Sequence, residues 1–591
     1  MLNTGKRQKA AKSVAKTGGA DLMQKSKLNS QSRSEPCSKS ESKSKPQRQP
    51  KRQSKSKWDI LIKNGRVVDG TGNPSSNFDI AVKDGKIERV DRSLRGDAQV
   101  VIDASGSIVS PGFVDLHNHT EMAALAYPQC ESHIMQGITT SVVGNCGLAM
   151  APINPEKLHL LKQYVGPFLP DGFDWGWDWL SLDDYCRKLE RQGISMNMAP
   201  LAGQGSIRLA VRGFDSDEST PEQIEEMKQL LRDSLKQGAW GMSAGLIYPP
   251  GCYANMSEMI ELAKVVADYG GIYATHLRNE GDRLMDAVQE AITIGRESGA
   301  RVEISHHKVL GKHNWGKVNA TLREMERARE QGVNVSCDCY PYKACSTTLT
   351  ACMPPWTMTG GVKAMLERLR DPELRKRIAR EIEDNSVEME NMIKGSGWEG
   401  IVIASCPANH GFDGKSMAEI LPGRYETSDM YQAFLDFMLE IDGEASMIAF
   451  AMDEADVATV IAHPLTSVVT DAWLTKAEAQ ERPHPRSYGS MPRLIRRYVV
   501  EDKVLSLEDA IRKMTSLSAS VVGLPNRGLI REGFAGDLVV FDLNKIRDAA
   551  TFQVPNRYPE GIEYVIVNGV VTVDHGRHTG ALNGRVLRKR R

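Results

Sequence analysis

The chain has 591 residues, no formal net charge and 41% hydrophobic residues, so it is long enough for one large domain, a satellite domain and a sizeable core. It has no run of about 18 apolar residues and its start lacks the apolar core of a secretory signal, so we expect a soluble, cytoplasmic protein without a membrane partner. Its ten cysteines do not form paired CxxC motifs. We therefore expect reduced thiols rather than a disulfide framework.

Residues 1–57 differ in composition from the rest of the chain. They hold 16 lysines and arginines against 3 acidic residues, a local charge of +13. Because serine, lysine and glutamine dominate and apolar residues are few, this segment cannot bury enough surface to offset its ordering entropy, and we expect disorder. A solvated extension is favoured over a nucleic-acid or anionic-surface tether, because no aromatic residue interleaves the charges.

The two ends of the folded part have the same β-rich texture. Residues 58–110 contain short alternating runs separated by turn signals, and Asp84-Gly85 between two such runs indicates a hairpin. The stretch 526–591 has similar runs at 536–542 and 564–571 and ends in a short tail. We expect the two ends to pair into one small β-sandwich, with two separate edge ribbons as the alternative.

Between these ends, five apolar runs each end in a residue that can bind a metal ion. Such residues at the carboxyl ends of successive strands, with helical stretches between the strands, are typical of an α/β fold of the (β/α)8 TIM-barrel type. A helical stretch begins, for example, at Thr220-Pro221 as N-cap and first turn. We therefore predict a metal-dependent barrel over 111–525. The residues that end the runs are His117 with His119, Cys146, His276, His306 and Asp471.

The seventh and eighth strands are far apart in the sequence. Residues 333–337 resemble the seventh strand, but the run before Asp471 comes over a hundred residues later, which is too long for one barrel crossover. We expect an inserted segment at about 341–446, with a charged helical run from Leu366 to Asp384. This segment is predicted to cover the mouth of the active site as a lid.

A thiolate and two imidazoles suit zinc, and three protein ligands with a water molecule are the usual catalytic arrangement. Cys146, His276 and His306 supply that set. Alternation along 302–306 favours His306 over His307 as the ligand, since residues i and i+2 of a strand share a face. The same alternation directs His117 and His119 to one side of their strand end.

Several motifs resemble those of the N-acyl-D-amino-acid deacylases, or D-aminoacylases, of the amidohydrolase superfamily. The resemblance covers the chain from about residue 58 to its end, with the motifs in the right order. It implies a zinc enzyme in which Cys146, His276 and His306 hold one metal and His117 and His119 form a weaker adjacent position bridged by Cys146. The matching motifs are the segment around His117 and His119, 143–147, 238–250, 275–280, 305–308 and 484–486.

The remaining roles divide between proton transfer and substrate binding. Asp471, at the end of the eighth strand, is placed to accept the water proton and deliver it to the leaving amine. Lys308, Tyr340 and Arg486 resemble the family's residues for the substrate carboxylate, and bidentate geometry makes Arg486 the best anchor. The chain departs from the family at Thr120-Glu121, where two aspartates are common, which puts the second metal position in doubt.

We predict zinc-dependent hydrolysis of the amide bond of N-acyl-D-amino acids, releasing a carboxylate and a D-amino acid. One alternative is a cyclic-amide hydrolase of the hydantoinase or dihydropyrimidinase type. Those enzymes use a carboxylated lysine on the fourth strand, and residues 239–245 contain no lysine. Another is a catalytically inactive amidohydrolase-like interaction protein, which the joint presence of Cys146, His276, His306 and Asp471 disfavours. The expected partner is a small-molecule substrate.

Overall fold

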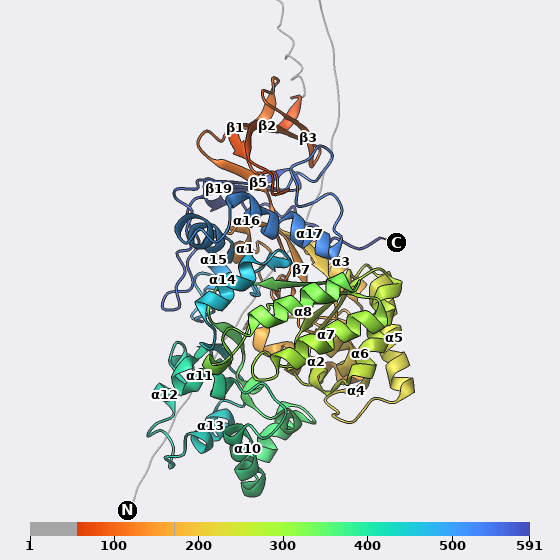
Figure 1. Ribbon diagram of the computed structural model, residues 1–591, viewed down its shortest axis with the longest axis vertical. Coiled ribbons are helices and arrows are strands. Elements are labelled where there is room, and N and C mark those ends of the chain that lie inside the picture. The colour runs from red at the N-terminus through yellow and green to blue at the C-terminus, as the bar shows by residue number, and fades with distance from the viewer. Residues whose placement is uncertain (1–55, 171, 591) are drawn as a thin grey trace, which may run out of the picture. The chain divides into compact units, whose positions relative to one another are not determined.

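The computed structural model describes residues 56–170 and 172–590 (Figure 1). The basic segment predicted to be disordered lies outside these residues, except for its last two positions. In the described part of the chain, no helix is long and apolar enough to cross a membrane.

Eight parallel strand positions form the barrel, as predicted. They pair in chain order, and Leu201 N–H donates to the Val143 carbonyl (2.8 Å) where the third position passes from β8 to β9. The ring closes between the last and first strands, because Asp471 N–H donates to the His117 carbonyl and His119 N–H to the Ala472 carbonyl, both at 2.8 Å. The strands are β6 (Phe113–Asp115), β7 (Ile138–Val143), β8 (Asn197–Pro200) with β9 (Ala202–Gly203), β10 (Gly241–Gly245), β11 (Ile272–His276), β12 (Arg301–Ile304), β13 (Val335–Cys339) and β17 (Thr466–Val468).

Helices cover the outside of the barrel, and α5 to α8 lie side by side in Figure 1. The predicted helix start at Thr220 is confirmed: its side chain accepts the Gln223 N–H, and the Gln223 side chain accepts the Thr220 N–H. This reciprocal pair satisfies two N–H groups that a helix start leaves free. The barrel helices are α1 (Glu131–Ile134), α2 (Leu158–Val165), α3 (Leu182–Gln192), α4 (Gln204–Arg212), α5 (Pro221–Lys236), α6 (Met256–Asp268), α7 (Leu284–Ser298), α8 (Val318–Glu330), α14 (Glu454–Ala462), α15 (Arg486–Arg493), α16 (Leu507–Met514) and α17 (Ser516–Val522).

The predicted pairing of the two β-rich ends is confirmed, and the strands of the predicted β-sandwich are hydrogen-bonded as one nine-stranded sheet. The join is antiparallel, between β5 and β18, with Val109 opposite Val540. The predicted hairpin is also confirmed: Asp84 and Gly85 connect β2 and β3 with φ values of 48° and 78°, the positive φ pair of a type I′ turn. The strands are β1 (Trp58–Val67), β2 (Ser76–Lys83), β3 (Lys86–Asp91), β4 (Ala98–Asp103), β5 (Ile108–Pro111), β18 (Leu538–Phe541), β19 (Ile562–Val567), β20 (Val570–Asp574) and β21 (Arg577–His578).

The segment between β13 and β17 has a sheet and an apolar core of its own. The predicted helical run from Leu366 to Asp384 is helical except at Asp371, where one helix ends and a second begins. Asp371 accepts the N–H groups of Glu373 and Leu374 as N-cap, and Pro372 begins the second helix. The elements are β14 (Cys345–Thr348), α9 (Val362–Arg370), α10 (Pro372–Asp384), α11 (Met392–Gly400), β15 (Ile401–Ser405), α12 (Met417–Ile420), α13 (Met430–Glu440) and β16 (Ser446–Ala449).

Candidate metal centre and active site

Six metal-capable side chains from five barrel strands meet at one end of the barrel, and all are buried. This follows from the parallel strand order, because the carboxyl ends of all eight strands open on the same face. These residues form two groups. Within each group the ligand atoms all lie within 4.8 Å of one another, and the thiol of Cys146 belongs to both groups. The first group is Cys146, His276 and His306, and the second is His117, His119, Cys146 and Asp471.

The distances in the first group fit a single metal ion. Cys146 Sγ lies 3.9 Å from His276 Nδ1 and 3.5 Å from His306 Nε2. Zinc bonds of about 2.3 Å to sulfur and about 2.0 Å to nitrogen, at tetrahedral angles, place the two ligand atoms roughly 3.5 Å apart. The residues present therefore suit zinc in both chemistry and spacing.

The second group adds Asp471 to the histidines of the HxH motif. Asp471 Oδ1 lies 3.4 Å from His117 Nε2 and 3.5 Å from His119 Nε2. Cys146 Sγ lies 3.3 Å from His117 Nε2. The thiol thus belongs to both groups, and Asp471 lies where it could be a further metal ligand.

The charges of the cluster favour a cation. Burial alone would raise the pKa of the Cys146 thiol, but attraction to His117 and hydrogen bonds with the neighbouring histidines hold that pKa well below its usual range. Burial would likewise raise the pKa of Asp471, but Arg486 and the histidines hold it well below the ordinary value. A thiolate and a carboxylate thus face one another across the histidines, and a metal ion between them would neutralise both.

The carboxylate of Glu280 orients the histidines from behind, a contact that the sequence reasoning missed. Its Oε1 pairs with His306 Nδ1 at 3.1 Å, and its Oε2 lies 3.5 Å from His276 Nε2. Lys308 Nζ donates to both oxygens, at 2.7 and 2.6 Å. Although burial would raise the pKa of Glu280, these positive neighbours hold it far below normal. The signal in the sequence was its place four residues after His276.

A third group of ligand atoms joins His276 and Glu280 to Glu390 from the inserted segment. Glu390 Oε2 accepts the Glu280 N–H at 2.5 Å. However, the Lys308 ammonium already bonds both oxygens of Glu280 and would repel a second cation. The residues of this group are therefore better suited to hydrogen bonds with one another and with Lys308 than to binding a metal ion.

The residues predicted to bind a substrate carboxylate take different positions. Arg486, at the start of α15, donates through Nη1 to Asp471 Oδ2 (2.6 Å) and through Nη2 to the Ser346 carbonyl (3.2 Å). Arg486 and Lys308 both line the cavity at the strand ends. Tyr340 is absent from that lining, and its hydroxyl donates instead to Met452 Sδ at 3.7 Å.

Two neighbours of the predicted ligands lie apart from the group. His307 Nε2 pairs with Thr321 Oγ1 at 2.8 Å on α8, and burial lowers its pKa to about 4. At Thr120-Glu121, where the family pattern is lost, both carboxylate oxygens of Glu121 are buried without a hydrogen-bond partner among the described residues. Burial raises the pKa of Glu121 to about 7. A protonated Glu121 would add no charge beside His119.

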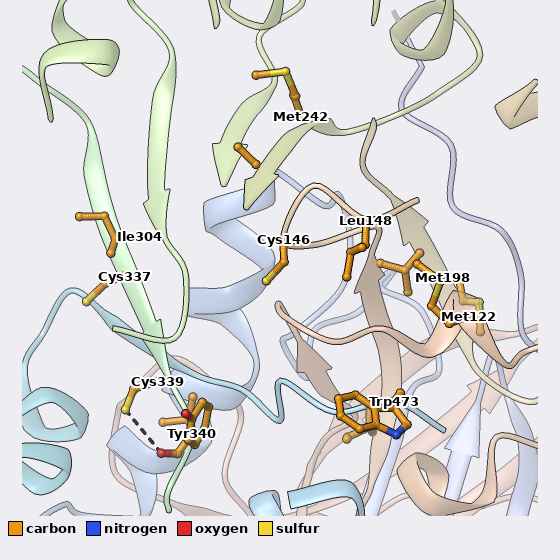
Figure 2. Close-up of a cluster of buried hydrophobic side chains, with 14 of the residues drawn as sticks. Met122, Cys146, Leu148, Met198, Met242, Ile304, Cys337, Cys339, Tyr340 and Trp473 are labelled. Carbon is orange, nitrogen blue, oxygen red and sulfur yellow. Dashed lines mark hydrogen bonds between the residues drawn. The ribbon is translucent and has the colours of Figure 1, made fainter. Parts of the chain in front are cut away.

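Of two adjoining cavities, the smaller reaches the cluster. The smaller, of about 20 Å³, is lined by metal-capable residues and by Cys345, Ser346, Thr347 and Met392 of the inserted segment. The larger has a volume of about 390 Å³. Figure 2 shows Cys146 and Leu148 on the same side of the loop after β7, with Trp473 nearby. The two cavities share four lining residues, which are Leu148, Phe168, Tyr248 and Trp473.

The nine cysteines within the described ranges are all free thiols. Cys337 is buried on β13, where its Sγ contacts Thr466 Oγ1 at 3.4 Å. Burial raises the pKa of the Cys337 thiol well above its usual range, in contrast to that of Cys146. Among the described cysteines, Cys146 is therefore the one that combines burial with a lowered pKa.

Comparisons with known proteins agree with this geometry. The Amidohydrolase family model matches residues 100–389 and 469–573. An N-acyl-D-aspartate deacylase of Alcaligenes xylosoxydans xylosoxydans is 34% identical over 90% of this chain and 95% of its own length. An N-acyl-D-glutamate deacylase of the same organism is 33% identical over 90% and 97%.

Solved structures give the same assignment. A D-aminoacylase structure, described as defining a novel subset of amidohydrolases, is 33% identical with a TM-score of 0.74, over 90% of this chain and all of that one. An N-acyl-D-glutamate deacylase of Bordetella bronchiseptica, complexed with zinc and a phosphonate mimic of the tetrahedral intermediate, is 32% identical with a TM-score of 0.73 over the same shares. The chain therefore belongs to the amidohydrolase family, in the group of the N-acyl-D-amino-acid deacylases.

Proposed function

We propose that this protein is a zinc-dependent N-acyl-D-amino-acid deacylase, which hydrolyses the N-acyl amide bond and releases a carboxylate and a D-amino acid. The observation that carries the proposal is the buried set of one thiolate and two imidazoles, with Asp471 beside it. The deacylase names of its relatives support the choice of substrate. On β10, the fourth strand, no lysine is present for the carboxylated bridge of a hydantoinase.

Cys146, His276 and His306 would hold the zinc ion, and His117 and His119 would complete a second position through Cys146. The donor set and the 3.5–3.9 Å separations support the first position. A related D-aminoacylase is described as having a binuclear centre in which one metal activates and a second attenuates. Bound zinc supplies Lewis-acid chemistry, because it acidifies water and polarises carbonyl groups.

Asp471 would move the proton. Its Oδ2 is held by Arg486, so its Oδ1 is directed at the histidines of the cluster. In the proposed reaction Oδ1 accepts a proton from the attacking water and passes it to the amide nitrogen, which leaves as an amine. The lowered pKa of Asp471 keeps the group ionised before the reaction begins.

Arg486 and Lys308 would bind the α-carboxylate of the substrate, because they are the cationic side chains that line the small cavity. Arg486 then has two roles, since it also fixes Asp471. Tyr340 stays a predicted carboxylate ligand; its hydroxyl would have to turn from Met452 to reach the cavity. The lid role of the inserted segment, a cytoplasmic location and the role of the basic segment also stay predictions.

The direct test is a substrate panel. The purified full-length chain, loaded with zinc, is given N-acetyl-D-amino acids and the matching L series, and release of free amino acid is measured. We expect hydrolysis of the D series and little of the L series. Equal rates on both series, or hydrolysis of dihydropyrimidine rings instead, would contradict the proposal.

A further inference from the structure

The larger cavity is built to receive part of a ligand. Its volume of about 390 Å³ lies in the range of about 300–1,000 Å³ that small-molecule sites occupy. The small cavity at the strand ends, of about 20 Å³, has space for reacting groups but not for a long substituent. Because Leu148, Phe168, Tyr248 and Trp473 line both cavities, a substrate held at the cluster can extend across these four side chains into the larger space.

The buried walls of the larger cavity are mostly apolar, with Thr348 and Ser446 as buried polar residues, and its charged residues are exposed or half-buried. The charged lining residues are the exposed Lys162, Lys363, Asp442 and Glu444, with the half-buried Glu481. Since the carboxylates outnumber the lysines, the cavity does not favour an anionic group. An uncharged apolar chain fits it better. The buried apolar lining includes Phe214, Met358, Leu366, Ala404, Ala445 and Leu474.

The position of the carboxylate anchors decides which end of the substrate enters. Arg486 and Lys308 line the small cavity and are absent from the lining of the larger one. The α-carboxylate of the proposed substrate is therefore held outside the larger cavity. The carbonyl carbon must lie at the cluster, and its remaining substituent is the acyl chain.

The side chains that line both cavities lie beside the metal-capable cluster, where the acyl chain of the proposed substrate would begin. The Phe168 ring stacks over His119 with centroids 6.3 Å apart, and Tyr248 meets His276 edge-on at 5.2 Å. Phe168 also contacts the Trp473 ring at 5.7 Å. These rings give an apolar path from the metal-capable histidines into the larger cavity.

We propose that the enzyme takes N-acyl-D-amino acids that carry a medium-length linear acyl chain, such as octanoyl, with the chain lying in the larger cavity. The inference rests on the deacylase function proposed above. Water adds to the amide carbon and the C–N bond breaks, so that the products are the fatty carboxylate and the D-amino acid. The cavity selects the acyl group, and Arg486 with Lys308 selects the amino-acid end.

The inference predicts a steep dependence on acyl length. Burial of one methylene group is worth about fourfold in an equilibrium or rate ratio. Octanoyl has six more methylenes than acetyl, so burial of only two of them raises kcat/KM by more than about tenfold. The assay measures D-leucine release from N-acetyl, N-butanoyl, N-octanoyl and N-dodecanoyl-D-leucine by the zinc-loaded full-length chain. A parallel series keeps the acetyl group and varies the side chain through D-alanine, D-leucine, D-tryptophan and D-aspartate.

A variant in the wall of the larger cavity distinguishes binding of the acyl chain from the hydrolysis itself. Val362 lines the larger cavity, is half-buried and begins α9, and an acidic residue is tolerated in a first helical turn. Val362→Asp should lower kcat/KM for the octanoyl substrate by about tenfold or more and leave the acetyl substrate within about twofold. Ala364→Asp, two residues along the same helix and outside the cavity lining, is the matched control and should change neither.

The possible outcomes distinguish the acyl-cavity proposal from the proposed deacylase function on which it rests. A rise from acetyl to octanoyl that Val362→Asp removes supports the acyl cavity. A flat or falling acyl series, with acetyl substrates hydrolysed, overturns the cavity assignment and leaves the deacylase function standing. A strong side-chain dependence at fixed acetyl, removed by Val362→Asp, assigns the cavity to the amino acid and overturns it too. No hydrolysis of any member overturns the proposed function together with this inference.

Discussion

Replacing Glu280 with glutamine should weaken both zinc binding and folding, for two separable reasons. The carboxylate contacts the rear nitrogens of His306 and His276, at 3.1 and 3.5 Å. Hydrogen-bonded carboxylates behind metal-binding histidines typically contribute about 10–100-fold to metal affinity or activity. The same carboxylate neutralises the buried Lys308 ammonium, and removing one partner of a buried pair costs about 3–5 kcal/mol.

A double substitution separates the two effects. Glu280→Gln should lower zinc affinity about 10–100-fold in a chelator competition and lower the free energy of unfolding by several kcal/mol in urea. Adding Lys308→Met removes the unpaired cation, so the stability should largely return while the zinc affinity stays low. Glu290→Gln is the matched control, because Glu290 pairs with Arg278 and contacts neither histidine.

Two results would refute this reasoning. If Glu280→Gln keeps the zinc affinity of the parent protein, the carboxylate does not orient the histidines. If Glu290→Gln weakens zinc binding as much as Glu280→Gln, the effect is one of general stability and not of position. The zinc measurement and the urea measurement must therefore be made on the same preparations.

Four further outcomes are expected. Cys146→Ala should lose tightly bound zinc and nearly all activity, whereas Cys337→Ala should keep both, and equal zinc contents would contradict the site. Asp471→Asn should lower kcat by about 10²-fold or more with zinc retained; an unchanged kcat would remove the proton-transfer role. Arg486→Met should slow all substrates, because it releases Asp471, but should cost an additional factor for free carboxylates compared with their carboxamides; equal losses would argue against carboxylate binding. Burial lowers the pKa of His133 to about 3, so between pH 6.5 and pH 3 the unfolded state binds a proton at this histidine and the folded state does not. The free energy of unfolding should therefore be about 2 kcal/mol lower at pH 5 than at pH 7. Urea unfolding at the two pH values measures this loss, and His133→Gln should abolish it.

The residues at the strand ends could be predicted because one rule places them. Parallel strands of a closed barrel open on one face, so His276 and Cys146 meet although 130 residues separate them. The turn at Asp84-Gly85 and the helix start at Thr220 were equally local, since the residue types themselves fix the backbone there. The break at Asp371-Pro372 within the helical run is local in the same way, because Asp371 caps the second helix and Pro372 begins it.

Contacts made by residues beyond a strand end could not be predicted from the rule that parallel barrel strands open on one face. Tyr340 comes directly after β13, and its hydroxyl is directed at Met452 because the chain turns there, which strand alternation cannot indicate. The pairing of Asp471 with Arg486 depends on where α15 begins after a loop of some fifteen residues. Glu280 lies four residues past His276, but its contact with Lys308 is fixed by how β11 and β12 pair.

The residues that could be predicted belong to the metal-capable cluster, whereas several walls of the larger cavity could not be predicted. The Amidohydrolase family model matches residues 100–389 and 469–573, and the six metal-capable residues at the strand ends all lie in the matched parts. Several walls of the larger cavity, including Ala404 and Ala445, lie in the unmatched part between them. Because the inserted segment has its own apolar core, its residues can change without disturbing the barrel strands. Family motifs can thus indicate the chemistry, while the proposed selection of the acyl chain also depends on residues, such as Ala404 and Ala445, that those motifs do not include.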